Sequence, residues 1–105
     1  MTNLDASFSA LADPTRRAIL ARLALGETSV MELAKPFAMS LPAVSKHLGV
    51  LKGAGLVRDR REGRETHYSA QPKALAPLID WTRDMVGFWE HRFDQLEDLL
   101  KRMDQ

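Results

Sequence analysis

The segment from Ser40 to Val57 constrains the fold of this 105-residue chain more than any other. Ser40 can cap a helix, and Pro42 falls in the first turn, where a helix tolerates a missing N–H. At about 100° per residue, the apolar residues of this segment share one side: Leu41, Val44, Leu48 and Leu51. Gly55 is a helix stop. The segment therefore predicts an amphipathic helix, followed by an arginine-rich strand.

The outward face of this helix is small, polar and cationic. It holds Pro42, Ala43, Lys46 and Gly49, with Ser45 and Lys52 on its flank. An ordinary solvated face more often carries glutamate and long side chains. A narrow face without acidic residues can instead lie deep in a groove of DNA, so the helix is a candidate for DNA recognition.

Length and composition indicate one domain, residues 1–105, with 45% hydrophobic and 28% charged residues. The absence of cysteine excludes disulfides and thiolate metal ligands. The start, Met1–Asp5, lacks the pattern of a signal peptide, and no apolar run is long enough to span a bilayer. We therefore expect a cytoplasmic protein without a membrane partner.

Charge is sorted along the chain although the net charge is only +1. Residues 35–64 hold seven basic residues and two acids, whereas residues 79–105 hold four basic residues and seven acids. A basic middle and an acidic end suit a molecule that presents one surface to phosphates and holds another away from them.

Local signals predict five helices and a β-hairpin. The helices are expected from Leu4 to Leu11, from Asp13-Pro14 to Gly26, from a capping box at Ser29–Glu32 to about Phe37, from Ser40 to Gly55, and from Leu75 to Met103. The strands flank a turn at Glu62–Arg64. The fold class is mostly α with a β-hairpin wing: a winged helix-turn-helix, with the helix-turn-helix at 29–55, the wing at 56–70 and a dimerisation helix at 75–103.

Three ordered motifs resemble the bacterial ArsR/SmtB-type winged helix-turn-helix regulators. They are Ala12–Leu20 (second helix), Glu32–Ala34 with Met39–Leu48 (helix-turn-helix), and Gly55–Val57 with Arg60–Arg64 (wing). The resemblance is to the cysteine-free branch that does not sense metals. It implies a homodimeric transcriptional regulator, usually a repressor, that binds a palindromic operator in double-stranded DNA. The small-molecule effector, if any, is unknown.

The expected DNA-binding residues lie on the fourth helix and the wing: Ser40, Leu41, Pro42, Ala43, Ser45, Lys46, His47, Lys52, Arg60, Arg61 and Arg64. Lys46 can reach a phosphate or a guanine edge, although a solvated lysine is the alternative. His47 points partly toward the core, so a structural role is nearly as plausible. The wing arginines suit the minor groove, and the alternative is a charged edge strand that resists aggregation.

Two of these residues depart from the family pattern. Leu41 and Pro42 stand where many members carry polar residues. This suggests that the first turn reads thymine methyls or DNA shape instead of hydrogen-bonding a base. Arg16 and Arg17, at the start of the second helix, could touch the DNA backbone or simply be solvated.

The last helix carries a nearly heptad apolar stripe, which predicts a homodimer through the first and last helices. The expected interface residues are Leu4, Phe8, Leu11, Leu78, Thr82, Met85, Trp89, Phe93, Leu96 and Leu100, with Met103 continuing the stripe and Trp81, Phe88 and Leu99 widening it. The alternative is a helix that folds back over its own core.

Other functions have weaker support in the sequence. Asp84, His91 and Asp94 could line one face of the last helix, but charged neighbours make a wet surface the better interpretation, so no metal or other cofactor is expected. No catalytic grouping or phosphate-binding loop indicates an enzyme. A winged helix that binds only proteins remains the alternative function, although it would not need the basic middle segment.

Overall fold

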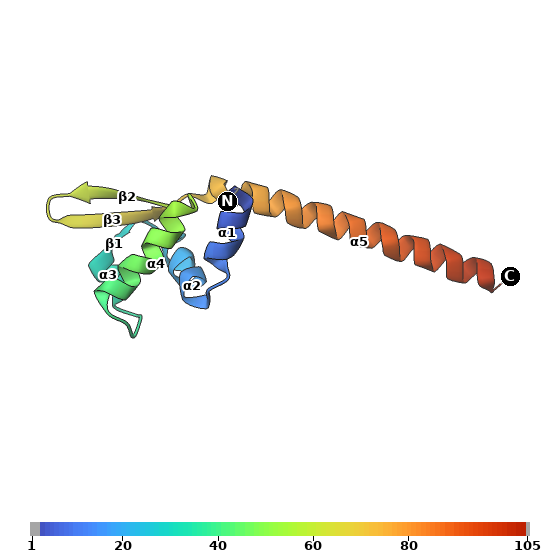
Figure 1. The fold of residues 1–105 in the computed structure, drawn as a ribbon, viewed down its shortest axis with the longest axis horizontal. Coiled ribbons are helices and arrows are strands. Elements are labelled where there is room, and N and C mark those ends of the chain that lie inside the picture. Colours follow the sequence, from blue (N-terminus) through green and yellow to red (C-terminus); the bar gives the residue numbers. More distant parts are fainter. Residues whose placement is uncertain (1–2, 105) are drawn as a thin grey trace.

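The structure is a computed structural model that describes residues 3–104 (Figure 1). Within these residues it has five α-helices, a short 3₁₀ helix and three strands. They are α1 (Asn3–Leu11), α2 (Pro14–Leu23), β1 (Thr28–Ser29), α3 (Val30–Ala34), α4 (Leu41–Gly53), β2 (Val57–Glu62), β3 (Glu65–Ala70), η1 (Pro72–Leu75) and α5 (Ala76–Met103). The predicted mostly-α fold with a β wing is confirmed.

Three helices begin at the capping residues that the sequence predicts. In each case the side chain accepts a hydrogen bond from the backbone N–H three residues later: Asp13 at 3.0 Å, Ser29 at 3.2 Å and Ser40 at 3.3 Å. Each cap has an extended backbone, so the chain changes direction as it enters the helix. The cap of α4 fixes where the candidate recognition helix starts.

The end of α4 is equally well determined. Gly55 adopts φ +77°, which a residue with a side chain rarely does. Its N–H bonds the carbonyl of Lys52 at 2.9 Å, and the N–H of Leu56 bonds the carbonyl of Leu51 at 3.0 Å. This pair of bonds is a Schellman motif. It turns the chain directly from α4 into β2, which places the wing beside the recognition helix.

Helix α3 is shorter than the sequence suggested. It ends at Ala34, whereas a helix to about Phe37 was expected. Pro36 explains the difference, because it has no N–H to continue the helical hydrogen bonds, although Lys35 before it still has helical backbone angles. Phe37 instead packs, half-buried, against the core.

The wing belongs to a three-stranded antiparallel sheet of order β1-β3-β2, where a two-stranded hairpin was predicted. The additional strand, β1, pairs Thr28 with Tyr68 and Ser29 with His67. Strands β2 and β3 are joined by Gly63 and Arg64, with Gly63 at φ +61° in the first turn position. The sheet thereby connects the wing to the start of α3.

The core lies entirely in the winged body. Its members are Ala10, Ile19, Leu23, Leu33, Ala34, Val44, Leu48, Leu51, Leu56 and Val57. Leu41, which the helical period assigned to the same apolar side as Val44, is instead 41% exposed. It is the first residue of α4 and lines a hollow beside Met31 of α3 instead of packing in the core.

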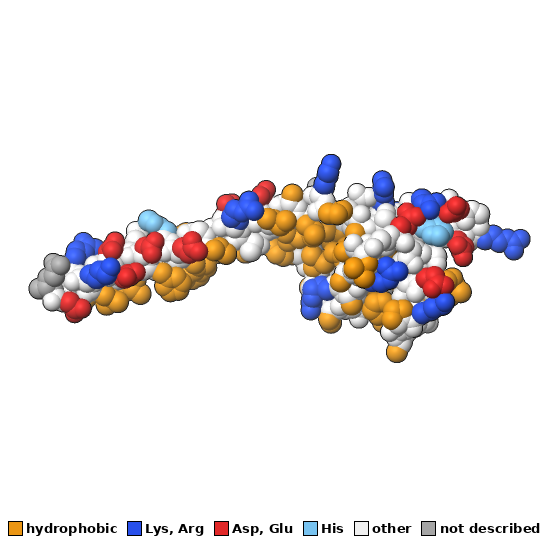
Figure 2. All heavy atoms as spheres, turned by 180° about the vertical axis from the view of Figure 1, so that it is seen from behind, with side chains coloured by type: hydrophobic (Ala, Val, Ile, Leu, Met, Phe, Trp, Pro, Cys, Tyr) orange, Lys and Arg blue, Asp and Glu red, His pale blue; other side chains and the backbone are white. Residues whose placement is uncertain are grey.

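Helix α5 leaves this body and projects into solvent, so the molecule is 74 Å long and at most 26 Å across its other axes (Figure 1). No residue of α5 is buried. Figure 2 shows apolar side chains along one side of the helix and over its junction with the body. The helix does not fold back over its own core. None of the helices within residues 3–104 has the length and apolar character needed to cross a membrane.

Candidate nucleic-acid interface

Helix α4 presents the predicted narrow face to solvent. Val44, Leu48 and Leu51 are fully buried on the opposite side. Pro42, Ser45, Lys46 and Gly49 are exposed, whereas Ala43, which was expected among them, is half-buried at the edge of the face. The exposed face therefore has mostly small side chains, one cation and no acidic residue, and Val50 is an exposed apolar residue one turn after Lys46.

His47 faces α2 instead of the outward face. Its Nδ1 lies 3.4 Å from Nη1 of Arg16, and its side chain is half-buried. Arg16 also donates from Nε to the Ala10 carbonyl at 2.7 Å, and Arg17 donates to the Leu11 carbonyl at 2.7 Å. The geometry favours a structural role for His47 and for both arginines, which bond carbonyls at the end of α1.

Two of the expected cationic contacts are already engaged in ion pairs. Lys52 Nζ lies 3.0 Å from Asp59, whose carboxylate raises the pKa of Lys52. Arg60 lies 2.6 Å from Glu27 and 3.1 Å from Glu62. The hydrogen bond with Arg60 lowers the pKa of Glu27. These two cations thus already have carboxylate partners within the chain.

The two other arginines expected to bind DNA from the wing, Arg61 and Arg64, lie near the hairpin tip, and their charge is not compensated by an ion pair among the described residues. Arg61 and Arg64 are exposed, and neither forms an ion pair with another residue of 3–104. Alternation along β2 puts Arg61 on the same face as Asp59, which contacts α4. Lys and Arg side chains stand at the free end of the wing in Figure 2. Together with Lys46 they give the α4 side of the wing its positive charge.

A hollow of about 250 Å³ lies between α3, the first turn of α4 and the hairpin tip. Met31, Leu41, Ser45 and Arg64 are among the residues that line it. The structure therefore brings together three predicted contact residues, and adds Met31, which sequence reasoning missed. The sequence signal that could have indicated Met31 was its position as an apolar residue in the first turn of the short helix that Ser29 caps.

The expected dimer residues lie mainly on the exposed side of α5. Thr82, Trp89, Phe93, Leu96 and Leu100 are exposed, while Leu78 and Met85 are half-buried. On α1, Leu4 and Leu11 are half-buried, and Phe8 packs edge-to-face against Trp81 of the same chain with ring centroids 5.3 Å apart. Helix α1 thus supports the base of α5 and widens its apolar surface.

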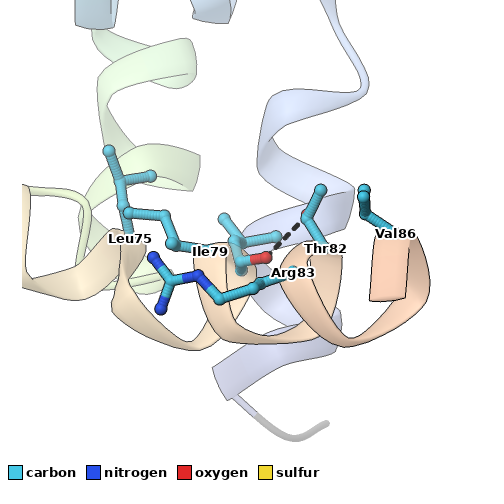
Figure 3. A pocket seen from close by; sticks show the side chains of 6 residues that line it. Leu75, Ile79, Thr82, Arg83 and Val86 are labelled. Carbon is cyan, nitrogen blue, oxygen red and sulfur yellow. Dashed lines mark hydrogen bonds between the residues drawn. The ribbon is translucent and has the colours of Figure 1, made fainter. Parts of the chain in front are cut away.

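The first half of α5 contains an open apolar groove of about 500 Å³ (Figure 3). Ile79 and Val86, seven residues apart beside the predicted stripe, line it and were missed. The Thr82 hydroxyl donates to the Leu78 carbonyl at 2.7 Å, so its polar atom is satisfied within the helix. The groove therefore offers an almost wholly apolar surface.

Among residues 3–104, no group of three His, Asp or Glu side chains is arranged to hold a metal ion. Asp84, His91 and Asp94 all lie on exposed parts of α5.

Comparison with protein families supports the helix-turn-helix. A family model described as a helix-turn-helix domain matches residues 11–60. The HTH-type transcriptional regulator Rv2034 of Mycobacterium tuberculosis is 49% identical over 80% of this chain and 83% of its own length. The transcriptional repressor SdpR of Bacillus subtilis is 37% identical over 76% of this chain and 89% of its own length.

Solved structures are similar over the same region. The crystal structure of an ArsR family transcriptional regulator superposes with a TM-score of 0.80 at 39% identity, and the match covers 85% of this chain and 98% of that one. A solution structure from Mycobacterium bovis, described as a homodimeric winged helix-turn-helix DNA-binding domain, superposes with a TM-score of 0.66 at 33% identity, covering 81% of this chain and 79% of that one.

Proposed function

We propose a function from the premise that this chain belongs to the ArsR family of winged helix-turn-helix transcriptional regulators. The family consists of DNA-binding regulators and not of enzymes. Beyond this, we propose that the chain binds a palindromic operator in double-stranded DNA as a homodimer and represses transcription.

The observation that carries the proposal is the outward face of α4 beside the wing. Its side chains are small enough for the helix to enter the major groove, and Lys46 stands on that face without an acidic neighbour. Arg61 and Arg64 can reach the flanking backbone or minor groove from the wing. Lys52 and Arg60 are held in ion pairs and should contribute less.

The dimer rests on the apolar surface of α5. Large side chains that no part of residues 3–104 covers run along this helix, and a second copy of the helix can bury them. A two-fold axis through α5 would give two recognition helices for two half-sites, about one DNA turn apart. The homodimeric domain from Mycobacterium bovis supports a homodimer.

Repression is the regulatory direction that the relatives support, since one is named a repressor. A dimer bound over a promoter would exclude polymerase by occupying the site. The absence of cysteine and the dispersed histidines support binding without a metal, so a chelator should leave operator affinity unchanged.

The test begins with an operator selected from random duplexes by the purified chain. Fluorescence anisotropy then compares the affinities of Lys46→Ala for the operator and for a random duplex. If Lys46 reads a base, operator binding should weaken by roughly 1–3 kcal/mol more than random binding. Lys101→Ala is the matched control, because Lys101 pairs with Glu97 on α5, away from α4.

Two results would contradict the proposal. One is that no duplex can be selected. The other is that Lys46→Ala binds both duplexes with wild-type affinity while its melting curve shows that it is folded.

A further inference from the structure

Four large apolar side chains are exposed on and near α4, namely Met31, Met39, Leu41 and Val50, and two of them lie beside the same hollow. Leu41, the first residue of the helix, is 41% exposed, and Met31 of α3 is 57% exposed. Both line the hollow between α3, α4 and the hairpin tip. Neither helps to form the core, so their apolar surface can be removed from water only by something that binds here.

The position of Leu41 indicates what that is. Residues at the N-terminal end of a recognition helix contact base edges in the major groove. Leucine cannot exchange a hydrogen bond there, and the apolar group that the major groove offers is the 5-methyl of thymine. We propose that Leu41, extended by Met31, forms an apolar socket for a thymine methyl and so determines sequence specificity.

The charges around the hollow suit a base beside its phosphate. Arg64 lies on the wing side of the hollow without an ion-pair partner in the described chain. The Ser45 hydroxyl is a further donor. Glu65 also lines the hollow, and its carboxylate lies 3.4 Å from Nε2 of His67. Arg64 can therefore hold the backbone of the strand whose thymine enters the socket.

The inference rests on the proposed function, and its experiment removes one methyl group at a time. Each thymine of the selected operator is replaced by deoxyuridine, which keeps every hydrogen-bonding group. For the wild-type chain, one position in each half-site should show about fourfold weaker binding, the effect expected for one buried methyl group. All other positions should stay near a ratio of one.

The same replacements are then measured with variants. Leu41→Ala should bind the thymine and deoxyuridine operators equally, and Met31→Ala should reduce the discrimination. Val50→Ala is the matched control: Val50 is an apolar residue of α4 with 39% exposure that lies outside the hollow, and its variant should keep the fourfold ratio. Thermal melts confirm that each variant is folded.

The outcomes separate this inference from the function beneath it. The proposed thymine socket is contradicted if an operator is bound but no thymine responds to methyl removal. It is also contradicted if Leu41→Ala keeps the wild-type ratio between the affinities for the thymine and deoxyuridine operators. In both cases the proposed DNA-binding function is unaffected. If no duplex is bound at all, the proposed function falls and the socket with it.

Discussion

Nη1 of Arg16 in α2 lies 3.4 Å from Nδ1 of His47 in α4, with His47 as the acceptor when its proton is on Nε2. The same guanidinium donates to the carbonyls of Ser9 and Ala10 in α1. The side chain of Arg16 therefore connects α1, α2 and α4.

We expect Arg16→Ala to lower the free energy of unfolding by about 2 kcal/mol, because it removes charge-assisted bonds to two carbonyls and to His47. Arg17→Ala is the control: it loses one exposed bond to Leu11 and should cost less than about 1 kcal/mol. Urea unfolding measures both. Equal losses in the two variants would show that Arg16 does not connect the helices.

The two wing arginines that differ in pairing should differ in salt dependence. Arg64→Ala should flatten the slope of log affinity against log salt by about one unit, because one phosphate contact is lost. Arg60→Ala should leave the slope unchanged, because Arg60 is already paired with Glu27 and Glu62. Titrations of a random duplex at several salt concentrations measure the slopes, and the same flattening in both variants would refute the distinction.

Charges placed on the apolar side of α5 should separate the proposed dimer. Trp89→Glu combined with Phe93→Glu would bury two carboxylates without partners, at a cost of several kcal/mol. Sedimentation should then detect monomers. His91→Glu places the same charge on the polar side of the helix and should leave the dimer intact. A wild-type monomer at micromolar concentration would contradict the dimer itself.

The cap of α2 should contribute to acid sensitivity. The hydrogen bond from the Arg16 N–H lowers the pKa of Asp13 below its ordinary 3.8. Because the folded pKa is depressed, the stabilisation is complete above about pH 3.8 and is lost as the pH falls through the lower folded value. Asp13→Asn keeps the hydrogen-bond acceptor but has no carboxyl group that titrates. Between about pH 4 and about pH 2, where Asp13 titrates, the urea midpoint of the variant should therefore fall less than that of the wild-type protein. An identical fall in both proteins would contradict this.

Local signals predicted most of the fold because they act over a few residues. Asp13, Ser29 and Ser40 cap the helices as expected, and Gly55 ends the recognition helix through bonds that span one turn. Pro36 also indicated that α3 ends before Phe37, but the expected helix was extended past this proline.

The parts that could not be predicted depend on residues far apart in the chain. Strand β1 has two residues and exists only because Tyr68 and His67 lie beside it. The ion pair of Arg60 with Glu27 joins residues that are 33 apart, so the wing appeared to offer three equivalent arginines. Leu41 fits the apolar period, but a period cannot show that no helix packs over the first residue of α4.

Every buried core residue lies between positions 10 and 57, so α5 contributes no buried residue to the core. In the proposed dimer, substitutions along α5 beyond its base, where Trp81 packs against Phe8 of α1, would change which copies pair with little effect on the stability of the winged body. After gene duplication, changes in α5 alone could therefore produce two regulators that do not form mixed dimers, while the DNA-binding surface stays the same.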